Sequence, residues 1–414
     1  MDDRLRRALL IVGAVAVLAA PVLALEQIGT GRSADGFSHR PALSADGRYV
    51  AFETTARFTS DDRDRRSDVY IYDRQVKNFR RLPRSSKSHG AAGVTFSRDG
   101  RFAAYHVFDI LPRIHVEPVD SVTLMDLGTG ETWKIPPETG KKPDGEAIYP
   151  VLGQSGGWVL FSSDAERLAG QRAGPVREIF LFDRDKRTVE LLSQTPDGDA
   201  ANRPCAEPHA TPDGRFVAFL SLATNLPPAV PASSLSERLY LLDRSSGTLL
   251  RIDEKERGID PAGWIAGRFS MDDDGEEIVF EARQRKAGSP SDNLESLDLF
   301  LFERSSGTIT KLTSGLFAGR SHSPAMSGNG RWTAFVFAGV PKERDPGGVV
   351  VYDRKNDVWR RLASGRCVNP AISADGHWIA FESSDSRFAR NLRGFSHIFV
   401  VENPAYEPDN AAGH

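Results

Sequence analysis

The chain has 414 residues, of which 40% are hydrophobic and 26% are charged, and its formal net charge is −3. Basic and acidic residues are mixed along its length, without the basic block typical of nucleic-acid binding or the basic amphipathic helix typical of a membrane surface. The composition is that of a folded globular protein, and it predicts no nucleic-acid partner.

The first 24 residues have the features of a secretory signal peptide. A basic start at residues 4–7 precedes the 18-residue apolar run Ala8–Leu25. Pro21 would break a helix near its end, and Val22 and Ala24 are small residues at the positions that precede a cleavage site. An uncleaved anchor is the alternative, because a run of this length can span a bilayer. We favour cleavage, which predicts a periplasmic or secreted protein without membrane insertion afterwards.

From residue 25 to residue 404, one nine-residue phrase recurs seven times, most clearly as Ser-Ala-Asp-Gly-Arg-Tyr-Val-Ala-Phe in residues 44–52. Its turn glycines are Gly47, Gly100, Gly156, Gly214, Gly275, Gly330 and Gly376. Its last residues are Phe52, Tyr105, Phe161, Phe219, Phe280, Phe335 and Phe381. A repeat of this kind predicts one structural unit per copy.

Each of the first six copies predicts four short strands, and the seventh predicts three. The Asp-Gly dipeptide closes a tight hairpin between the first strand and a second one such as Tyr49–Phe52. A third run such as Val69–Tyr72 and a fourth such as Phe79–Leu82 follow. Four antiparallel strands in about 46–61 residues are the content of one propeller blade. We therefore predict an all-β, seven-bladed β-propeller, with the last aromatic of each phrase buried between blades.

The two ends of the repeat region predict how the ring closes. The seventh copy ends near Val401 without a fourth strand, whereas residues 25–30 have the pattern of one. We expect this N-terminal strand to pair in the C-terminal blade, beside residues 397–401, because an open ring would expose strand edges. Residues 405–414 are expected to form a disordered polar tail.

The phrase at Pro41–Phe52, followed by Val69–Arg74, resembles the repeat of TolB-like (WD40-like) propellers of exported bacterial proteins. The resemblance covers about residues 26–402, and a proline opens the inner strand in five of the seven units. It implies the propeller fold. The chain has no room for the additional domains of TolB or of prolyl-oligopeptidase-type proteins, so their activities are not carried over.

The connections between the second and third strands are the longest in each unit, about 12–18 residues, which predicts one loop-rich face. The entry to each inner strand lies on that face, around the central channel. The candidate ligand-binding residues at this channel mouth are His39, Arg40, His106, Glu207, Arg268, His322 and Asn369. Histidines there would also suit metal binding or acid–base chemistry, and propellers that act as pectic-fragment lyases use histidine-rich central sites.

A separate group of carboxylates precedes the third strand of the first unit. Asp62, Asp64 and Asp68 are spaced as oxygen ligands for a hard cation such as calcium. The arginines interleaved with them would instead make an ion-pair loop. No other cofactor is predicted.

Cys205 and Cys367 occupy equivalent positions in units four and seven, on nearly opposite sides of the ring. A disulfide requires Cα atoms within about 7 Å, so we predict that the two cysteines stay unpaired in spite of the oxidising compartment.

Two functions fit these features. The first is a non-catalytic binding scaffold, expected to be a monomer, that recognises an envelope protein or a glycan with its loop-rich face. The second is a carbohydrate-active enzyme, a lyase or a glycosidase, with a site of histidines and carboxylates at the channel mouth. Three or more such groups within about 4–5 Å of one point would favour the enzyme.

Overall fold

The computed structural model describes residues 24–29, 35–84, 89–109, 121–135, 145–165, 168, 176–231, 236–252, 265–285, 294–313, 320–339, 345–388 and 394–407. Over these ranges the protein consists of strands and their connections, and none of the described residues forms a helix long and apolar enough to cross a membrane. The predicted signal peptide lies outside the described residues, apart from Ala24.

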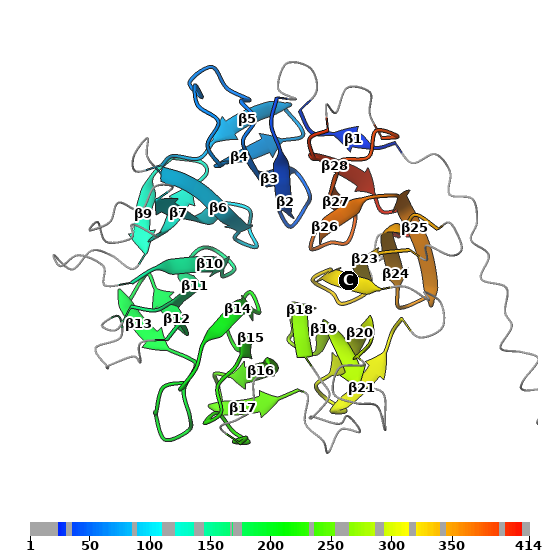
Figure 1. The fold of residues 1–414 in the computed structure, drawn as a ribbon. Helices are drawn as coiled ribbons and strands as arrows, with labels where there is room; N and C mark the ends of the chain where they lie inside the picture. Colours follow the sequence, from blue (N-terminus) through cyan, green and yellow to red (C-terminus); the bar gives the residue numbers. More distant parts are fainter. Residues whose placement is uncertain are drawn as a thin grey trace, which may run out of the picture.

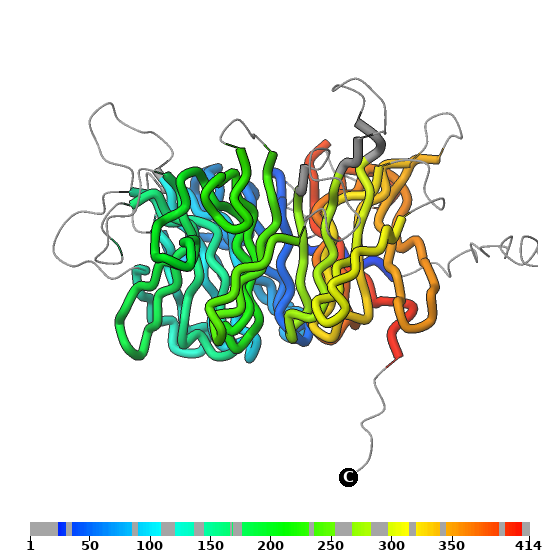
Figure 2. The backbone as a smooth tube through the Cα atoms, turned by 90° about the horizontal axis from the view of Figure 1, so that it is seen from below, coloured from blue at the N-terminus to red at the C-terminus, as the bar shows by residue number. Residues whose placement is uncertain are grey.

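The described strands form seven four-stranded antiparallel sheets arranged around a central channel, as Figure 1 shows. The predicted seven-bladed propeller is therefore confirmed. In the first six blades the chain runs from the channel outward through four consecutive strands. Figure 2 shows the ring from the side, with the last described residues on one face.

Each blade has four strands, most of them four to eight residues long. Blade 1 contains β2 (Ser38–Leu43), β3 (Tyr49–Thr54), β4 (Asp68–Asp73) and β5 (Asn78–Arg81), and blade 2 contains β6 (His89–Phe96), β7 (Phe102–Asp109), β8 (Ser121–Asp126) and β9 (Thr132–Ile135). Blade 3 contains β10 (Ala147–Leu152), β11 (Trp158–Ser163), β12 (Glu178–Asp183) and β13 (Thr188–Leu191). Blade 4 contains β14 (Cys205–Ala210), β15 (Phe216–Ser221), β16 (Arg238–Asp243) and β17 (Thr248–Arg251). Blade 5 contains β18 (Ile265–Met271), β19 (Glu277–Arg285), β20 (Leu294–Glu303) and β21 (Thr308–Lys311). Blade 6 contains β22 (Ser321–Met326), β23 (Trp332–Phe337), β24 (Gly348–Asp353) and β25 (Val358–Ser364), and blade 7 contains β26 (Cys367–Ile372), β27 (Trp378–Ser383), β28 (His397–Glu402) and β1 (Glu26–Gln27).

The core is divided among the junctions between blades. Seven clusters of buried apolar side chains each combine residues of two neighbouring blades. The last aromatic of every repeated phrase lies in or beside these junctions, with at most 1% of its surface exposed. The aromatic side chains thus hold blade to blade, as the repeat predicted, because one sheet cannot bury both of its own faces.

The N-terminal strand closes the ring. In β1, Glu26 pairs with Val400 and Gln27 with Phe399 of β28, in antiparallel register. The backbone N–H of Ile28 then donates to the carbonyl of Ile398 at 2.9 Å. The predicted closure is confirmed, although the paired strand is shorter than the expected residues 25–30, and Thr30 lies outside the described residues.

The start of the predicted polar tail contacts the propeller. The ring of Tyr406 stacks on His377 at 4.2 Å between centroids and lies 5.6 Å from Trp332. Glu407 lies beside Arg331, with 3.4 Å between the carboxylate and the guanidinium. The segment therefore packs against blades 6 and 7 as far as residue 407, and residues 408–414 lie outside the described residues.

Both cysteines are free and buried, so the predicted absence of a disulfide is confirmed. Burial raises the pKa of the Cys205 thiol to about 12 and that of the Cys367 thiol to about 11. These thiols are therefore protonated near neutral pH, and they pack as small apolar groups.

Candidate ligand site at the loop-side mouth

Every inner strand carries a β-bulge where it enters the channel. The pairing of the first and second strands shifts register in all seven blades, at the same distance from the turn glycine in six of them and one residue earlier in blade 5. The residues seven positions before the turn glycines are Arg40, Gly93, Tyr149, Glu207, Arg268, Ser323 and Asn369. We call these seven residues the bulge ring, and the end of the channel that they surround the loop-side mouth.

The bulges have an unusual backbone. Six of the seven ring residues have positive φ angles, from 47° at Arg40 to 63° at Gly93, and Arg268 is the exception. Five of these six residues precede a proline, such as Pro41. These prolines were predicted to start the inner strands, whereas β2 already begins at Ser38. Proline is accommodated inside the strand because a bulge leaves its position without a ladder hydrogen bond.

Three glutamates hold the bulges in place, each six residues after a turn glycine on the second strand of its blade. Glu53 Oε1 accepts a hydrogen bond from the backbone N–H of Gly93 at 2.9 Å. Glu281 accepts two, from the backbone N–H of Arg268 at 3.0 Å and from that of Ser323 at 2.8 Å. Glu53 and Glu281 thereby each fix the bulge of the following blade.

The third glutamate, Glu382, connects blade 7 to blade 1. Its carboxylate contacts His39 Nδ1 at 2.8 Å and accepts from Asn369 Nδ2 at 2.9 Å, and it also bonds to the backbone of Arg40. The hydrogen bond to Glu382 raises the pKa of His39. Burial alone would raise the pKa of Glu382, but its hydrogen bonds from His39 and Asn369 hold it below the ordinary value.

Arg268 extends this network across three blades. Its guanidinium donates to Asn369 Oδ1 at 2.9 Å and to Ser323 Oγ at 3.4 Å, so that a side chain of blade 5 reaches blades 6 and 7. Ser323 Oγ also contacts His322 Nδ1 at 3.0 Å. The structure therefore brings together five of the residues predicted for the site, namely His39, Arg40, Arg268, His322 and Asn369.

The two remaining predicted residues, Glu207 and His106, have pKa values that reflect their burial. Burial raises the pKa of Glu207, against the opposing charge of Arg268. Burial also lowers the pKa of His106 to about 4, so its imidazole is neutral near pH 7. The ring of His106 lies 6.5 Å from that of Tyr149, which was not among the predicted site residues.

The three glutamates were missing from the predicted site. Glu53, Glu281 and Glu382 share one register position in three repeats, and a comparison of the aligned phrases could have found them. Ser323 and Tyr149 were also missed, although they occupy the same repeat position as Arg40. The prediction relied on side-chain type, whereas repeat position was the stronger signal.

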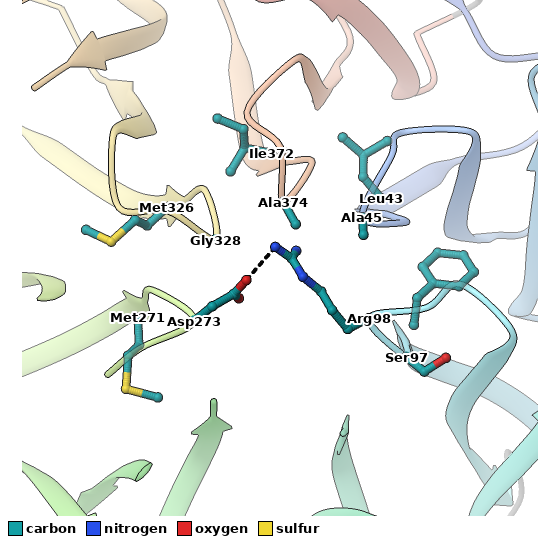
Figure 3. A pocket seen from close by; sticks show the side chains of 11 residues that line it. Leu43, Ala45, Ser97, Arg98, Met271, Asp273, Met326, Gly328, Ile372 and Ala374 are labelled. Carbon is teal, nitrogen blue, oxygen red and sulfur yellow. Dashed lines mark ion pairs between the residues drawn. The ribbon is translucent and has the colours of Figure 1, made fainter. Parts of the chain in front are cut away.

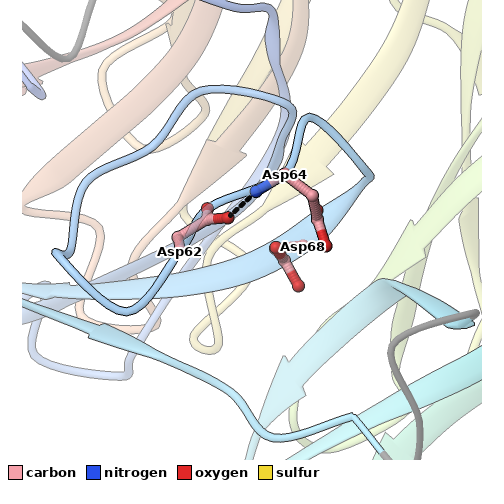
Figure 4. Close-up of side chains that lie close together, drawn as sticks. All are labelled: Asp62, Asp64 and Asp68. Atoms are coloured by element: carbon pink, nitrogen blue, oxygen red, sulfur yellow. Dashed lines mark hydrogen bonds between the residues drawn. The ribbon is translucent and has the colours of Figure 1, made fainter.

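The three aspartates predicted as a metal site do lie together, with ligand atoms within 4.8 Å of one another (Figure 4). Two arginines, one from β5 and one from the segment after it, form ion pairs with them. Arg84 lies 3.0 Å from Asp68 and 3.2 Å from Asp64, and Arg81 lies 3.5 Å from Asp62. These contacts account for the cluster as an ion-pair loop, and calcium does not enter the function proposed below.

Comparison with known proteins finds the same architecture. No family model matches the chain, and no curated protein matches it in sequence. An oligogalacturonate lyase in complex with manganese matches with a TM-score of 0.61 at 15% identity, covering 94% of this chain and 95% of that one. An oligogalacturonate lyase from Vibrio parahaemolyticus matches with a TM-score of 0.60 at 12% identity, covering 92% and 94%. The acylaminoacyl peptidase of Pyrococcus horikoshii matches with a TM-score of 0.56 at 10% identity, covering 91% of this chain and 53% of that one. At these identities the likeness establishes the propeller fold, which hosts many functions.

Proposed function

We propose that the protein is an exported, non-catalytic binding scaffold that holds a glycan at the loop-side mouth. The observation that carries the proposal is the bulge ring. Seven positions at one distance from the turn glycines, six of them with positive φ, present arginine, tyrosine, glutamate, serine, asparagine and a single glycine at one channel mouth. A ring with only a structural role would favour glycine at each positive φ, because other residues cost free energy there.

A mixed ring suits the chemistry of a sugar. Hydroxyl groups both donate and accept hydrogen bonds, and the mouth offers donors such as Arg268 beside acceptors such as Glu207. Two aromatic side chains at the mouth, Phe37 and Tyr149, are 43% and 42% exposed. An apolar ring face with polar groups around it is a common arrangement in ligand sites.

The test is titration calorimetry of the protein from residue 25 with two probe sets, acidic oligogalacturonides and neutral cello-oligosaccharides. We expect one set to bind, and Arg268→Gln to weaken binding by about tenfold or more, because a charge-assisted hydrogen bond is lost. Arg215→Gln is the matched control, since Arg215 pairs with Asp243 at 3.1 Å beside an Asp-Gly turn. The absence of binding by either set, or an equal loss in both variants, would contradict the proposal.

A carbohydrate lyase is the second candidate. It is supported by the contact between His39 and Glu382 at the mouth, which couples a base to a carboxylate. In the described part of the chain, the three aspartates of blade 1 form a cluster of such groups, with ligand atoms within 4.8 Å of one another. No cluster of three or more histidine, cysteine or acidic side chains lies at the mouth among the same residues. This geometry favours the scaffold. The ultraviolet absorbance of an unsaturated product, formed from oligogalacturonides by the purified protein and lost in His39→Gln, would favour the lyase instead.

Export has its own test. The basic start and the small residues Val22 and Ala24 support cleavage before Leu25. N-terminal sequencing of protein recovered from the cell envelope or the medium should therefore begin at Leu25. A mature chain that retains residues 4–7 would indicate an anchor.

A further inference from the structure

The opposite end of the channel is surrounded by the tight turns that contain the seven turn glycines, and we call it the turn-side mouth. The residues two positions before the turn glycines are Ala45, Arg98, Gln154, Pro212, Asp273, Gly328 and Ala374. Arg98 of blade 2 and Asp273 of blade 5 are the two charged members of this set. Their side chains meet in an ion pair across the channel, as Figure 3 shows.

The ion pair borders a small cavity. The cavity has a volume of about 150 Å³, and its apolar side chains are Leu43, Phe96, Met271, Met326 and Ile372. Each of these residues lies four positions before a turn glycine, so they form one layer of the channel. The channel thus changes from the polar bulge ring at one mouth to an apolar layer and then to a single ion pair at the other.

The backbone at this mouth is continuous in two arcs. In one arc, the N–H of Asp273 donates to the carbonyl of Gly328 and the N–H of Gly328 to that of Ala374, and the N–H of Asp375 donates to the carbonyl of Ala45. The other arc runs from Asp99 through Gln154 to Pro212. Among the described turns, no backbone hydrogen bond joins blade 1 to blade 2 or blade 4 to blade 5 in this way. The side chains of Arg98 and Asp273 therefore connect the two arcs.

Gly328 leaves the space in which the pair fits. A Cβ atom at this position would clash with the ends of both side chains, the guanidinium of Arg98 and the carboxylate of Asp273. Gly328 does not have a positive φ, so its backbone does not itself require glycine. The ion pair, and not the backbone conformation, therefore requires glycine at position 328.

We propose that Arg98 and Asp273 form a plug that closes the turn-side mouth, so that the channel is blind-ended and a ligand enters and leaves only by the loop-side mouth. The two side chains are 27% and 33% exposed, so the ion pair is partly desolvated but still within reach of water. An ion pair of this kind is weak enough to open transiently, and its variants should change access by a measurable factor. The proposal does not depend on the identity of the ligand.

The experiment measures access to the apolar layer. Ile372→Cys, on a background that carries Cys205→Ser and Cys367→Ser, places one thiol in that layer on blade 7, which carries neither of the two charged residues. The rate of its reaction with a charged methanethiosulfonate reagent is then compared with and without the plug. Asp273→Asn removes the charge, and Gly328→Ala displaces both side chains without changing any charge.

We expect both variants to react about two- to fivefold faster than the parent, the factor that an ion pair of this exposure contributes. Ala374→Ser, at the same repeat position as Gly328, is the control and should react at the parental rate. Thermal melting establishes that each variant is folded, and either variant alone suffices if the other does not fold. A rate that stays at the parental value in a folded variant overturns the plug. Failure of glycan binding at the other mouth would leave this result unaffected.

Discussion

At the scale of single residues, the bulge ring places side-chain chemistry at positions that the backbone disfavours. Glu207 has a φ of 50° on the inner strand β14, and Ala210 follows on the same strand without a positive φ. A residue other than glycine in the left-handed region costs on the order of 1 kcal/mol, which glycine would recover.

This conflict predicts opposite behaviour for two glycine substitutions. Glu207→Gly should leave the free energy of unfolding unchanged or raise it by up to about 1 kcal/mol, because strain is relieved. Ala210→Gly should lower it by about 0.5–1 kcal/mol, as glycine ordinarily does in a strand. Denaturant melts of both variants check the prediction. If Glu207→Gly is the more damaging of the two, the side chain stabilises the fold and the argument for a functional ring is weakened.

The pair of His39 and Glu382 predicts a pH dependence. His39 has a raised pKa in the folded protein, so its stabilising contribution is present at low pH and is lost as the pH rises through that pKa. Glu382 has a lowered pKa, so its contribution is present above its ordinary value of 4.5 and is lost as the pH falls through the folded value. Both contributions coexist in mildly acidic solution.

Glu382→Gln should therefore destabilise the protein more at about pH 5.5 than at about pH 9, where His39 is neutral in both forms. Thermal melts at the two pH values measure this difference, and NMR titration of His39 should show a lower pKa in the variant. A destabilisation that is equal at both pH values would exclude a charged pair.

At the scale of elements, strands and turns could be predicted from the sequence because their signals are local. The Asp-Gly dipeptide and the alternating residues that follow, as in Tyr49–Phe52, determine a hairpin within a few positions. The bulges could not be predicted in the same way. A proline such as Pro41 is compatible with the start of a strand or with a bulge inside it, and the choice depends on pairing with β3.

The candidate site was predictable only in part for a related reason. His39, Arg268 and Asn369 could be placed at the same mouth from their repeat position. Their partners depend on contacts between blades, as in the bond from the backbone of Ser323 to Glu281. Such contacts join residues far apart in the chain. The shared repeat position of the three glutamates indicates which residues are involved, but no local pattern in either strand indicates which partners they contact.

The C-terminal segment from residue 405 was predicted to be a disordered tail, whereas its described part, as far as residue 407, packs against the propeller. Tyr406 packs on His377 and Trp332, and an aromatic contact of this kind contributes about 0.5–1.5 kcal/mol beyond area burial. Tyr406→Ala should therefore lower the free energy of unfolding by about 1–2 kcal/mol. Removal of residues 408–414 should leave it unchanged. Equal melting temperatures for wild type and Tyr406→Ala would show that the stacked geometry does not contribute to stability.

At the scale of the whole molecule, the ring is stabilised junction by junction. Each apolar cluster joins two neighbouring blades, so no single core holds all seven together. The chain passes from each blade into the next, but at the junction of blade 7 with blade 1 it does so only through β1, which is held in blade 7 by noncovalent pairing with β28. At that junction Arg74 of blade 1 bonds to Glu26 of β1 at 2.9 Å and lies 3.6 Å from the centroid of the Trp378 ring. Closure of the ring at this junction therefore depends on β1.

Deletion of residues 25–29 tests this dependence. It removes the strand paired with β28 and the side chain of Ile28, which is 2% exposed. Burial of one isoleucine alone contributes about 1.5–3 kcal/mol, so the melting temperature should fall by roughly 5 °C or more. The exposed edge of β28 should also promote association, measured by light scattering, because its backbone groups lose their partners. Since His39 and Glu382 meet across the same junction, ligand affinity at the loop-side mouth should fall although no deleted residue belongs to the bulge ring.

The matched control lacks residues 408–414, which is a comparable length of chain, and should melt at the same temperature as the wild type. If the two truncated proteins melt at the same temperature, β1 does not hold the ring closed.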